Sequence, residues 1–326
     1  MRIIQSTILL SCLIILFGCK PGNREKNQNS LQTETKSSIS GNFSISGAYA
    51  LYPLVRKWAD DFMKINPGVK IEVTKTGTGQ GIDDLLTKMN QLAMISRPLT
   101  DEEITAGIWS VPVAKDGVAP IINQKNPYFE KILNQGLSPE EYLKAFTSDK
   151  PLTWGELLDT NIKEKVIVYS RADESGAADV FADFLFKKSS DLKGIKVTGD
   201  DEMIKSVQEN KLALGFCNFS YAFDAATGER RKDIQIVPSD LDFDNKIDRK
   251  EIPFSNLFES HRGLWLGIYP KNLCRELTIS SVGKPTDPAI VEFLKYVLTV
   301  GQESIKETGL CGLNNVYIKY SLDKLR

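Results

Sequence analysis

Histidine is almost absent from this 326-residue chain, which contains only His261. Neither the Gly-x-Ser-x-Gly elbow of hydrolases nor the His-Glu-x-x-His motif of metalloproteases occurs. Ser175 has no candidate base close to it in the sequence. We therefore expect that the protein is not an enzyme, and that His261, beside Arg262, is a surface or packing residue.

An excess of charge of one sign is also lacking. The chain has 41 Lys and Arg against 42 Asp and Glu, so no polybasic surface for nucleic acid or acidic lipid is expected. Long apolar segments are missing as well. The run from Ile8 to Phe17 is too short for a transmembrane helix.

The N-terminus instead has the features of a lipoprotein signal. A basic start and the short apolar run lead to Leu16-Phe17-Gly18-Cys19, where a small residue precedes the cysteine. This pattern predicts a signal peptide over 1–18 and a lipid on Cys19. The protein would be exported and anchored to a membrane, facing the periplasm or the cell exterior. Residues 19–40 are polar and nearly free of large apolar side chains, which predicts a disordered tether.

Cysteines are few, five in all, and show no metal-ligand spacing. Cys12 would leave with the signal and Cys19 would carry the lipid. Cys217 ends an apolar run and is expected in the core. Export would allow a Cys274–Cys311 disulfide, and the sequence leaves this pairing open.

From about residue 41 the chain alternates predicted strands and helices with short turns between them. Such alternation predicts a mainly parallel sheet, whose ligands lie beyond the strand carboxyl ends, where turns lead into helix N-termini. The turns at 48–51, 76–81 and 96–97 are therefore expected at one edge. The Gly77-x-Gly79-x-Gly81 turn has neither the dinucleotide spacing nor a P-loop lysine, so it offers backbone N–H groups and the Thr78 hydroxyl.

A strand, turn and helix at 166–181 carry the main anion signal. Ser175 stands where a helix N-cap is expected, and the N–H groups of Gly176 and Ala177 follow it at the positive end of the helix dipole. Arg171 would add a full positive charge in a bidentate geometry suited to an oxyanion. Taken alone, the stretch is explained equally well by a capped helix after a surface Arg–Asp pair.

The run Arg171-Ala-Asp-Glu-Ser-Gly-Ala177 resembles the Arg-x-Asp-x-Ser-Gly-Thr motif of the periplasmic phosphate-binding proteins that feed phosphate ABC transporters. Segments similar to that family follow in the same order along nearly the whole mature chain. Residues 115–127 resemble the family's crossover into its second lobe, and residues 152–158 resemble a short helix in that lobe. Residues 212–216 resemble its closing strand, and residues 301–302 resemble the return to lobe one. The resemblance implies an α/β fold of the two-lobe, type II periplasmic-binding-protein kind, each lobe a mainly parallel sheet flanked by helices.

The resemblance also implies a division of the mature chain and a set of phosphate contacts. Lobe I would comprise 41–114 and a return segment 257–326, and lobe II would comprise 115–256. The implied contacts are Ala50, Leu51, Thr78, Ser96, Arg171, Ser175, Gly176 and Ala177. Asp173 is expected to orient Arg171 rather than touch the anion, because a second anion in the site would cost affinity.

Three of these positions depart from the family pattern. Leu51 stands where a hydroxyl residue is common, and Ala177 replaces a threonine, so both would offer only backbone N–H groups. Ser96 stands where some members have an aspartate that accepts a hydrogen bond from the protonated oxygen of hydrogen phosphate and repels sulfate. Ser96 accepts a hydrogen bond but does not repel, which predicts weaker rejection of sulfate.

Residues 240–251 fit the EF-hand calcium-loop template independently of that resemblance. Asn245 replaces the usual glycine at the sharp turn, where asparagine tolerates a left-handed conformation, and Ile247 is the buried eighth residue. Prolines flank the loop, which predicts a lone structural Ca²⁺ site rather than a paired sensor; the alternative is a solvated acidic loop. The predicted ligands are Asp240, Asp242, Asp244, the Lys246 carbonyl, Asp248 and Glu251.

These observations predict a lipid-anchored, monomeric binding protein that needs no cofactor for its function. It would capture inorganic phosphate between two lobes and deliver it to the transmembrane subunits of an ABC permease. Two alternatives stay open: a binding protein for another oxyanion, such as sulfate, molybdate or tungstate, and a phosphate-sensing or adhesion module without transport.

Overall fold

The computed structural model describes residues 39–248, 251 and 254–326. The predicted signal peptide, Cys19 and nearly all of the predicted tether lie outside these residues. Within the described part of the chain, no helix has the length and apolar character that a membrane crossing requires.

Strands and helices alternate through the first third of the described chain, as the apolar periodicity predicts. Helix α1 buries Leu54, Val55, Trp58 and Phe62 on one face, and strand β2 alternates buried and exposed residues. The elements are β1 (Gly41–Gly47), α1 (Tyr52–Ile65), β2 (Val69–Val73), α2 (Thr78–Leu86), β3 (Leu92–Ile95) and α3 (Asp101–Thr105).

The long strand β4 (Ile108–Asn123) leads into the middle of the chain. Helix α3 before this strand and helices α5 and α6 after it have complete capping boxes, with Thr100, Ser138 and Thr153 as their N-caps. The elements are α4 (Phe129–Gln135), α5 (Pro139–Thr147), α6 (Trp154–Leu157), β5 (Ile167–Arg171), α7 (Gly176–Phe184), η1 (Ser189–Asp191), β6 (Ile195–Val197), α8 (Gly199–Glu209), β7 (Ala213–Asn218), α9 (Phe219–Ala222) and β8 (Ile234–Ile236).

The remaining part of the chain is mostly helical around one long strand. Its elements are α10 (Leu257–Leu266), η2 (Lys271–Leu273), β9 (Cys274–Val282), α11 (Pro288–Leu298), η3 (Val300–Thr308) and α12 (Asn315–Leu325). The amphipathic helix predicted at 287–297 is α11, which Asp287 caps by accepting hydrogen bonds from the backbone N–H groups of Ala289 and Ile290.

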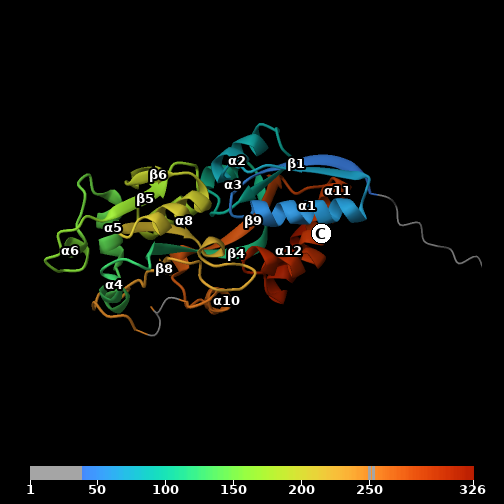
Figure 1. Ribbon diagram of the computed structural model, residues 1–326. Coiled ribbons are helices and arrows are strands. Elements are labelled where there is room, and N and C mark those ends of the chain that lie inside the picture. The colour runs from blue at the N-terminus through green and yellow to red at the C-terminus, as the bar shows by residue number, and fades with distance from the viewer. Residues whose placement is uncertain (1–38, 249–250, 252–253) are drawn as a thin grey trace, which may run out of the picture. The chain divides into compact units, whose positions relative to one another are not determined.

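The strands follow the order β2-β1-β3-β9-β4-β7-β5-β6, and β8 pairs with β4. Strand β1 is parallel to β2 and β3, and β5 is parallel to β6 and β7. Between these parallel groups lie β4 and β9, antiparallel to each other and adjacent in the middle of the fold (Figure 1). Each end of the sheet is therefore parallel, as predicted, and the two long strands connect the ends.

Two separate groups of buried side chains divide the fold into lobes. Along β4, Val111, Val113 and Ala114 pack in a core with β1, α1 and α11, whereas Val118 and Ile122 pack with α5, α7 and β7. Along the returning chain, Leu273 belongs to the second group and Leu277 to the first. We call the residues before 115 and after 276 the first lobe, and those between them the second lobe.

The return to the first lobe differs from the sequence-based boundary at residue 257. Leu257 and Leu264 of α10 pack with Ile121, Cys217 and Phe219, which are residues of the second lobe. The apolar spacing of α10 reveals one buried face but not which core covers it. Cys217 is buried in that core, as predicted, and Cys217, Cys274 and Cys311 are free thiols.

Candidate functional site

The carboxyl-end turns of both lobes meet around one small cavity of about 10 Å³. Helices α1, α2 and α7 begin at this cavity, so three positive helix ends face the same space. Pockets for organic ligands typically measure roughly 300–1,000 Å³, so only a very small ligand fits. The lining residues are Ala48, Tyr49, Ala50, Thr78, Ser96, Arg171, Glu174, Ser175, Gly176, Ala177, Asp200, Asn218 and Arg275.

The lobes approach each other closely at glycines. A Cβ on Gly176 would lie 2.1 Å from Ser96 Oγ and 2.8 Å from the Ser96 carbonyl oxygen. On Gly77, where φ is 95°, it would lie 2.7 Å from the Glu174 carbonyl oxygen. The turn of the second lobe therefore lies directly against two turns of the first, and the lobes are closed over the cavity.

Hydroxyl groups line the cavity from both lobes. Ser175 caps α7 as predicted, because its Oγ accepts hydrogen bonds from the N–H groups of Ala177 at 3.2 Å and Ala178 at 3.4 Å. Thr78 Oγ1 and Ser96 Oγ lie 3.0 Å apart, and both side chains are buried. A hydroxyl both donates and accepts, so these groups can serve protonated and unprotonated oxygens of an anion.

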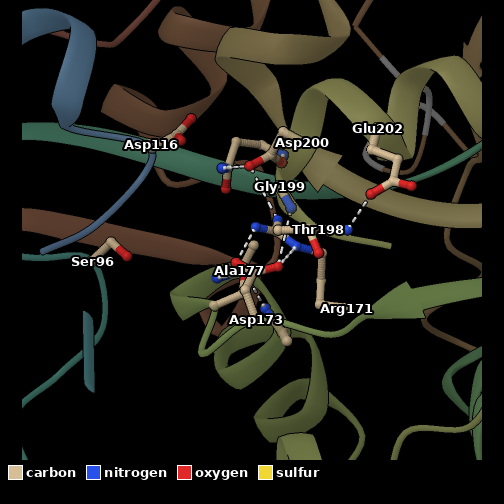
Figure 2. Close-up of polar contacts among 12 residues, drawn as sticks. Ser96, Asp116, Arg171, Asp173, Ala177, Thr198, Gly199, Asp200 and Glu202 are labelled. Carbon is tan, nitrogen blue, oxygen red and sulfur yellow. Dashed lines mark hydrogen bonds and ion pairs between the residues drawn. The ribbon is translucent and has the colours of Figure 1, made fainter. Parts of the chain in front are cut away.

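Arg171 is the buried cation of the second lobe (Figure 2). Its Nε and Nη2 donate to the two carboxylate oxygens of Asp173 at 2.8 and 2.6 Å, and its Nη1 donates to Asp200 at 3.1 Å. Asp173 thus orients Arg171, as predicted. Of the five guanidinium N–H donors, three are used in these contacts, which leaves two, one on each Nη atom.

The carboxylates around Arg171 are themselves held in place. The backbone N–H of Gly199 donates to Asp173 at 3.0 Å, and both the backbone N–H and the Nδ2 of Asn218 donate to Asp200 at 3.1 and 2.9 Å. Burial acts to raise the pKa of Asp173, but the hydrogen bonds and charge of Arg171 outweigh it and lower that pKa. Asp173 is therefore ionised at neutral pH and fixes the guanidinium in place.

Comparison with known proteins places this arrangement in a family. A family model described as a PBP superfamily domain matches residues 32–298, most of the chain. The chain belongs to the PBP superfamily. The predicted fold class, an α/β two-lobe fold of type II, is confirmed by solved structures of the same fold.

Several relatives of this PBP superfamily member carry names that state a ligand. A phosphate-binding protein PstS of Staphylococcus aureus is 25% identical over 98% of this chain and 90% of its own length. A putative phosphate ABC transporter substrate-binding protein with bound phosphate, from Clostridium perfringens, is 22% identical, with a TM-score of 0.66 over 84% of this chain and 100% of its own. An ABC-type phosphate transport receptor from Vibrio cholerae is 21% identical, with a TM-score of 0.65 over 83% of this chain and 100% of its own.

Leu51 is the one predicted anion contact that does not line the cavity in this PBP superfamily chain. Its side chain is fully buried in the first core, and its backbone N–H donates to the Ala48 carbonyl at 3.2 Å. The other seven predicted residues line the cavity together. Of the two residues predicted to contact an anion at the first turn, only Ala50 therefore lies at the cavity.

The bidentate contact predicted for Arg171 is restricted to one side of the guanidinium. Asp173 occupies the edge formed by Nε and Nη2, because the two residues are separated by a single position at the end of β5. An anion can therefore approach only the far end of the guanidinium, through Nη1 and Nη2.

Three lining residues lie outside the turns that the sequence singled out and were missed by sequence reasoning, namely Asp200, Asn218 and Arg275. Asp200 follows β6 and Asn218 ends β7, so a search for polar residues at every strand end would have found both. Arg275 lies near the beginning of β9 and has no such signal. Its Nη1 donates to the Ser96 carbonyl at 2.9 Å, and its Nη2 donates to Asn218 Oδ1 and lies 3.4 Å from Asp116 Oδ2.

Asp116, the partner of Arg275, should make stability depend on pH. Burial raises its pKa from 3.8 to about 6, although the charge of Arg275 and the N–H of Gly117 oppose this. The folded state thus holds the proton more tightly than the unfolded chain, so stability falls as pH rises from about 4 to about 6 and is then constant. At 1.36 kcal/mol per pKa unit, this loss is on the order of 3 kcal/mol.

The Asp116→Asn variant should lack this dependence. Urea unfolding at pH 4, 5, 6 and 7 would show the variant gaining stability relative to the wild type across that range. Other titrating groups cancel in the difference between the two proteins. Two curves that run parallel from pH 4 to 7 would show that Asp116 does not titrate in this window.

The predicted calcium loop brings three of its carboxylates together. Asp240, Asp242 and Asp244 each have an oxygen within 4.8 Å of the others. Burial, with the charges of Asp244 and Glu251, raises the pKa of Asp242. Asn245 has a φ of 59°, the left-handed conformation expected for it.

The other predicted ligands of this loop are not part of that group of three. Glu251 accepts hydrogen bonds from the N–H groups of Leu241 at 2.6 Å and Asp248 at 3.1 Å, and Asp248 is exposed. The N–H of Lys246 donates to Asp244 at 2.8 Å, and Ile247 is half-buried rather than buried. Residues 249 and 250 of the loop lie outside the described residues.

Proposed function

We propose that this protein binds inorganic phosphate in the cavity between its lobes and delivers it to an ABC-type permease. The observation that carries the proposal is the convergence of three helix N-termini, three buried hydroxyl groups and Arg171 on a space of about 10 Å³. Such donors, fixed in advance, offset the cost of burying a small multivalent anion. The printed names of the relatives point to the same ligand.

Closure of the lobes supports a capture role. Besides the glycine contacts, Arg97 of the first lobe lies 3.4 Å from Asp179 on α7 of the second. A permease would then recognise the closed, loaded form. In this proposal the protein is exported, lipid-anchored through Cys19 and monomeric, and it performs no chemical step.

Calorimetric titration of the chain from residue 20 onward with phosphate and with sulfate tests the proposal. We expect phosphate to bind more tightly than sulfate, and sulfate to bind measurably because Ser96 carries no charge to repel it. Native mass spectrometry would show whether phosphate is bound on purification. No binding of phosphate would contradict the function, and complete indifference to sulfate would contradict the role of Ser96.

The alternatives are separated by further measurements. Titration with molybdate and tungstate tests the other oxyanions. Permease and ATPase genes beside this one favour transport, whereas a neighbouring sensor kinase favours a sensing module. The small cavity disfavours an organic ligand in every case.

The 240–251 loop is proposed as a structural Ca²⁺ site, supported by its match to the twelve-residue template and by the three carboxylates that lie together. At a hundredfold excess over Kd, calcium would stabilise the fold by about 2.7 kcal/mol and raise the Tm by roughly 5 °C. Thermal melts with calcium and with chelator would measure this. The Asp240→Ala, Asp242→Ala double variant should lose the effect, and the half-buried pair Asp60→Ala, Asp61→Ala, on α1, should keep it. A wild type equally stable in both buffers would exclude the site.

A further inference from the structure

A second guanidinium, that of Arg275, borders the cavity from the strand that joins the lobes. Arg275 lies on β9, is 5% exposed and lines the same cavity as Ser96 and Arg171. Its Nη1 donates to the carbonyl of Ser96 in the first lobe, and its Nη2 donates to Asn218 in the second. One side chain therefore contacts both walls of the cavity.

The two guanidiniums differ in how fully their charges are offset. Arg171 has two carboxylate partners, with contacts at 2.6, 2.8 and 3.1 Å. Among the described residues, the one carboxylate paired with Arg275 is that of Asp116, at 3.4 Å, which is longer than the roughly 2.7–2.9 Å of a strong charge-assisted bond. Burial lowers the pKa of Arg275. More of its positive charge is therefore available to a ligand.

Arg275 also has a donor left over. Among the described residues, no hydrogen-bond partner exists for its Nε, although the atom is buried. An unpaired buried donor costs about 1–3 kcal/mol, and a charged one costs more, so such a group usually has a partner in the functional state. The adjoining cavity is where a small ligand would provide one.

We propose that Arg275 is a second anion-binding cation, whose Nε–H donates to the bound anion while its Nη1 holds the Ser96 turn at the cavity. This inference rests on the proposed function, because it takes inorganic phosphate as the anion. It assigns the anion two guanidiniums, one on the second lobe and one on the connecting strand. Affinity then depends on both.

Binding by variants tests this assignment. We expect Arg275→Gln to bind phosphate about 10- to 100-fold more weakly in calorimetry, and Arg275→Lys to recover part of the loss, because lysine keeps the charge but not the planar fork. Arg230 is a matched control: it is half-buried, its Nε also lacks a partner among the described residues, and it does not line the cavity. Arg230→Gln should bind as the wild type does.

A spectroscopic measurement separates contact with the anion from a purely structural role. In protein labelled with ¹⁵N-arginine, the Nε–H signals of Arg275 and Arg230 are assigned by their absence in the variants. Phosphate should shift the Arg275 signal and slow its exchange with water, and should leave the Arg230 signal unchanged. A structural role would weaken binding in Arg275→Gln without this shift.

The outcomes distinguish the two proposals. If wild type binds phosphate, and the Arg275 signal does not move or Arg275→Gln binds equally well, the assignment of Arg275 fails and the proposed function stands. If wild type binds no phosphate, the proposed function fails. The Nε measurement is then repeated with sulfate, and an unmoved signal overturns the assignment of Arg275 as well.

Discussion

Gly176→Ala is expected to abolish tight anion binding while leaving the fold intact. The added Cβ would lie 2.1 Å from Ser96 Oγ and 2.8 Å from the Ser96 carbonyl oxygen, so the closed form must open or distort. Overpacking of this kind costs about 1–3 kcal/mol, which predicts a loss of affinity of roughly 10- to 100-fold. Calorimetry with phosphate would measure the loss, and small-angle scattering would show less compaction on adding phosphate.

Gly176→Ala should weaken phosphate binding without lowering the stability of the anion-free protein. Gly176 is the first residue of α7, where alanine is a better helix former than glycine. The Tm without phosphate should therefore be unchanged or slightly higher. Gly312→Ala is the matched control, because its Cβ would meet neighbours only at 3.8 Å. Equal phosphate affinity in Gly176→Ala and wild type would mean that closure is not needed for binding.

Replacement of Arg171 is expected to have the other large effect. Arg171→Met removes the two N–H donors left for the anion, and each hydrogen bond to a charged group contributes about 1.5–3 kcal/mol. Affinity for phosphate should fall by roughly 100-fold or more in a calorimetric titration. Stability should fall too, by about 3–5 kcal/mol in urea unfolding, because Asp173 and Asp200 would stay buried without their cation.

Two further variants separate lost binding from lost folding. Arg171→Lys keeps the positive charge and should fold, but lysine lacks the planar guanidinium that Asp173 orients. We therefore expect it to lose affinity for phosphate, but less than Arg171→Met does. Arg56→Met removes a surface ion pair with Asp60 and should leave affinity unchanged. A folded Arg171→Met protein with wild-type affinity would show that Arg171 does not contact the anion.

Much of the site could be predicted because it follows from the order of the elements. In a parallel sheet the carboxyl ends of the strands share one edge, so the turns at Ala50, Thr78 and Ser96 had to lie near one another. The turn after β5 carried its own local signal in Ser175 and the residues that follow. The cap at Ser175 and the contact between Asp173 and Arg171 are confirmed by the structure.

The residues that could not be predicted depend on contacts between distant parts of the chain. Arg275 meets Ser96 and Asn218 only after β9 has paired with β4, and no local pattern encodes that pairing. For the same reason, the apolar face of α10 indicated burial without indicating the second lobe. Local periodicity determines which face is covered, whereas tertiary packing determines what covers it.

The division of the first lobe between the two ends of the chain affects the order of folding during synthesis. Phe43 near the beginning of β1 packs against Phe293 of α11, with ring centroids 5.6 Å apart, so this lobe cannot bury its interior until the last helices have been made. The second lobe draws its core, apart from Cys311, from one continuous segment. Since contacts over a short loop form earlier than those over a long one, we expect the second lobe to acquire structure first on the nascent polypeptide.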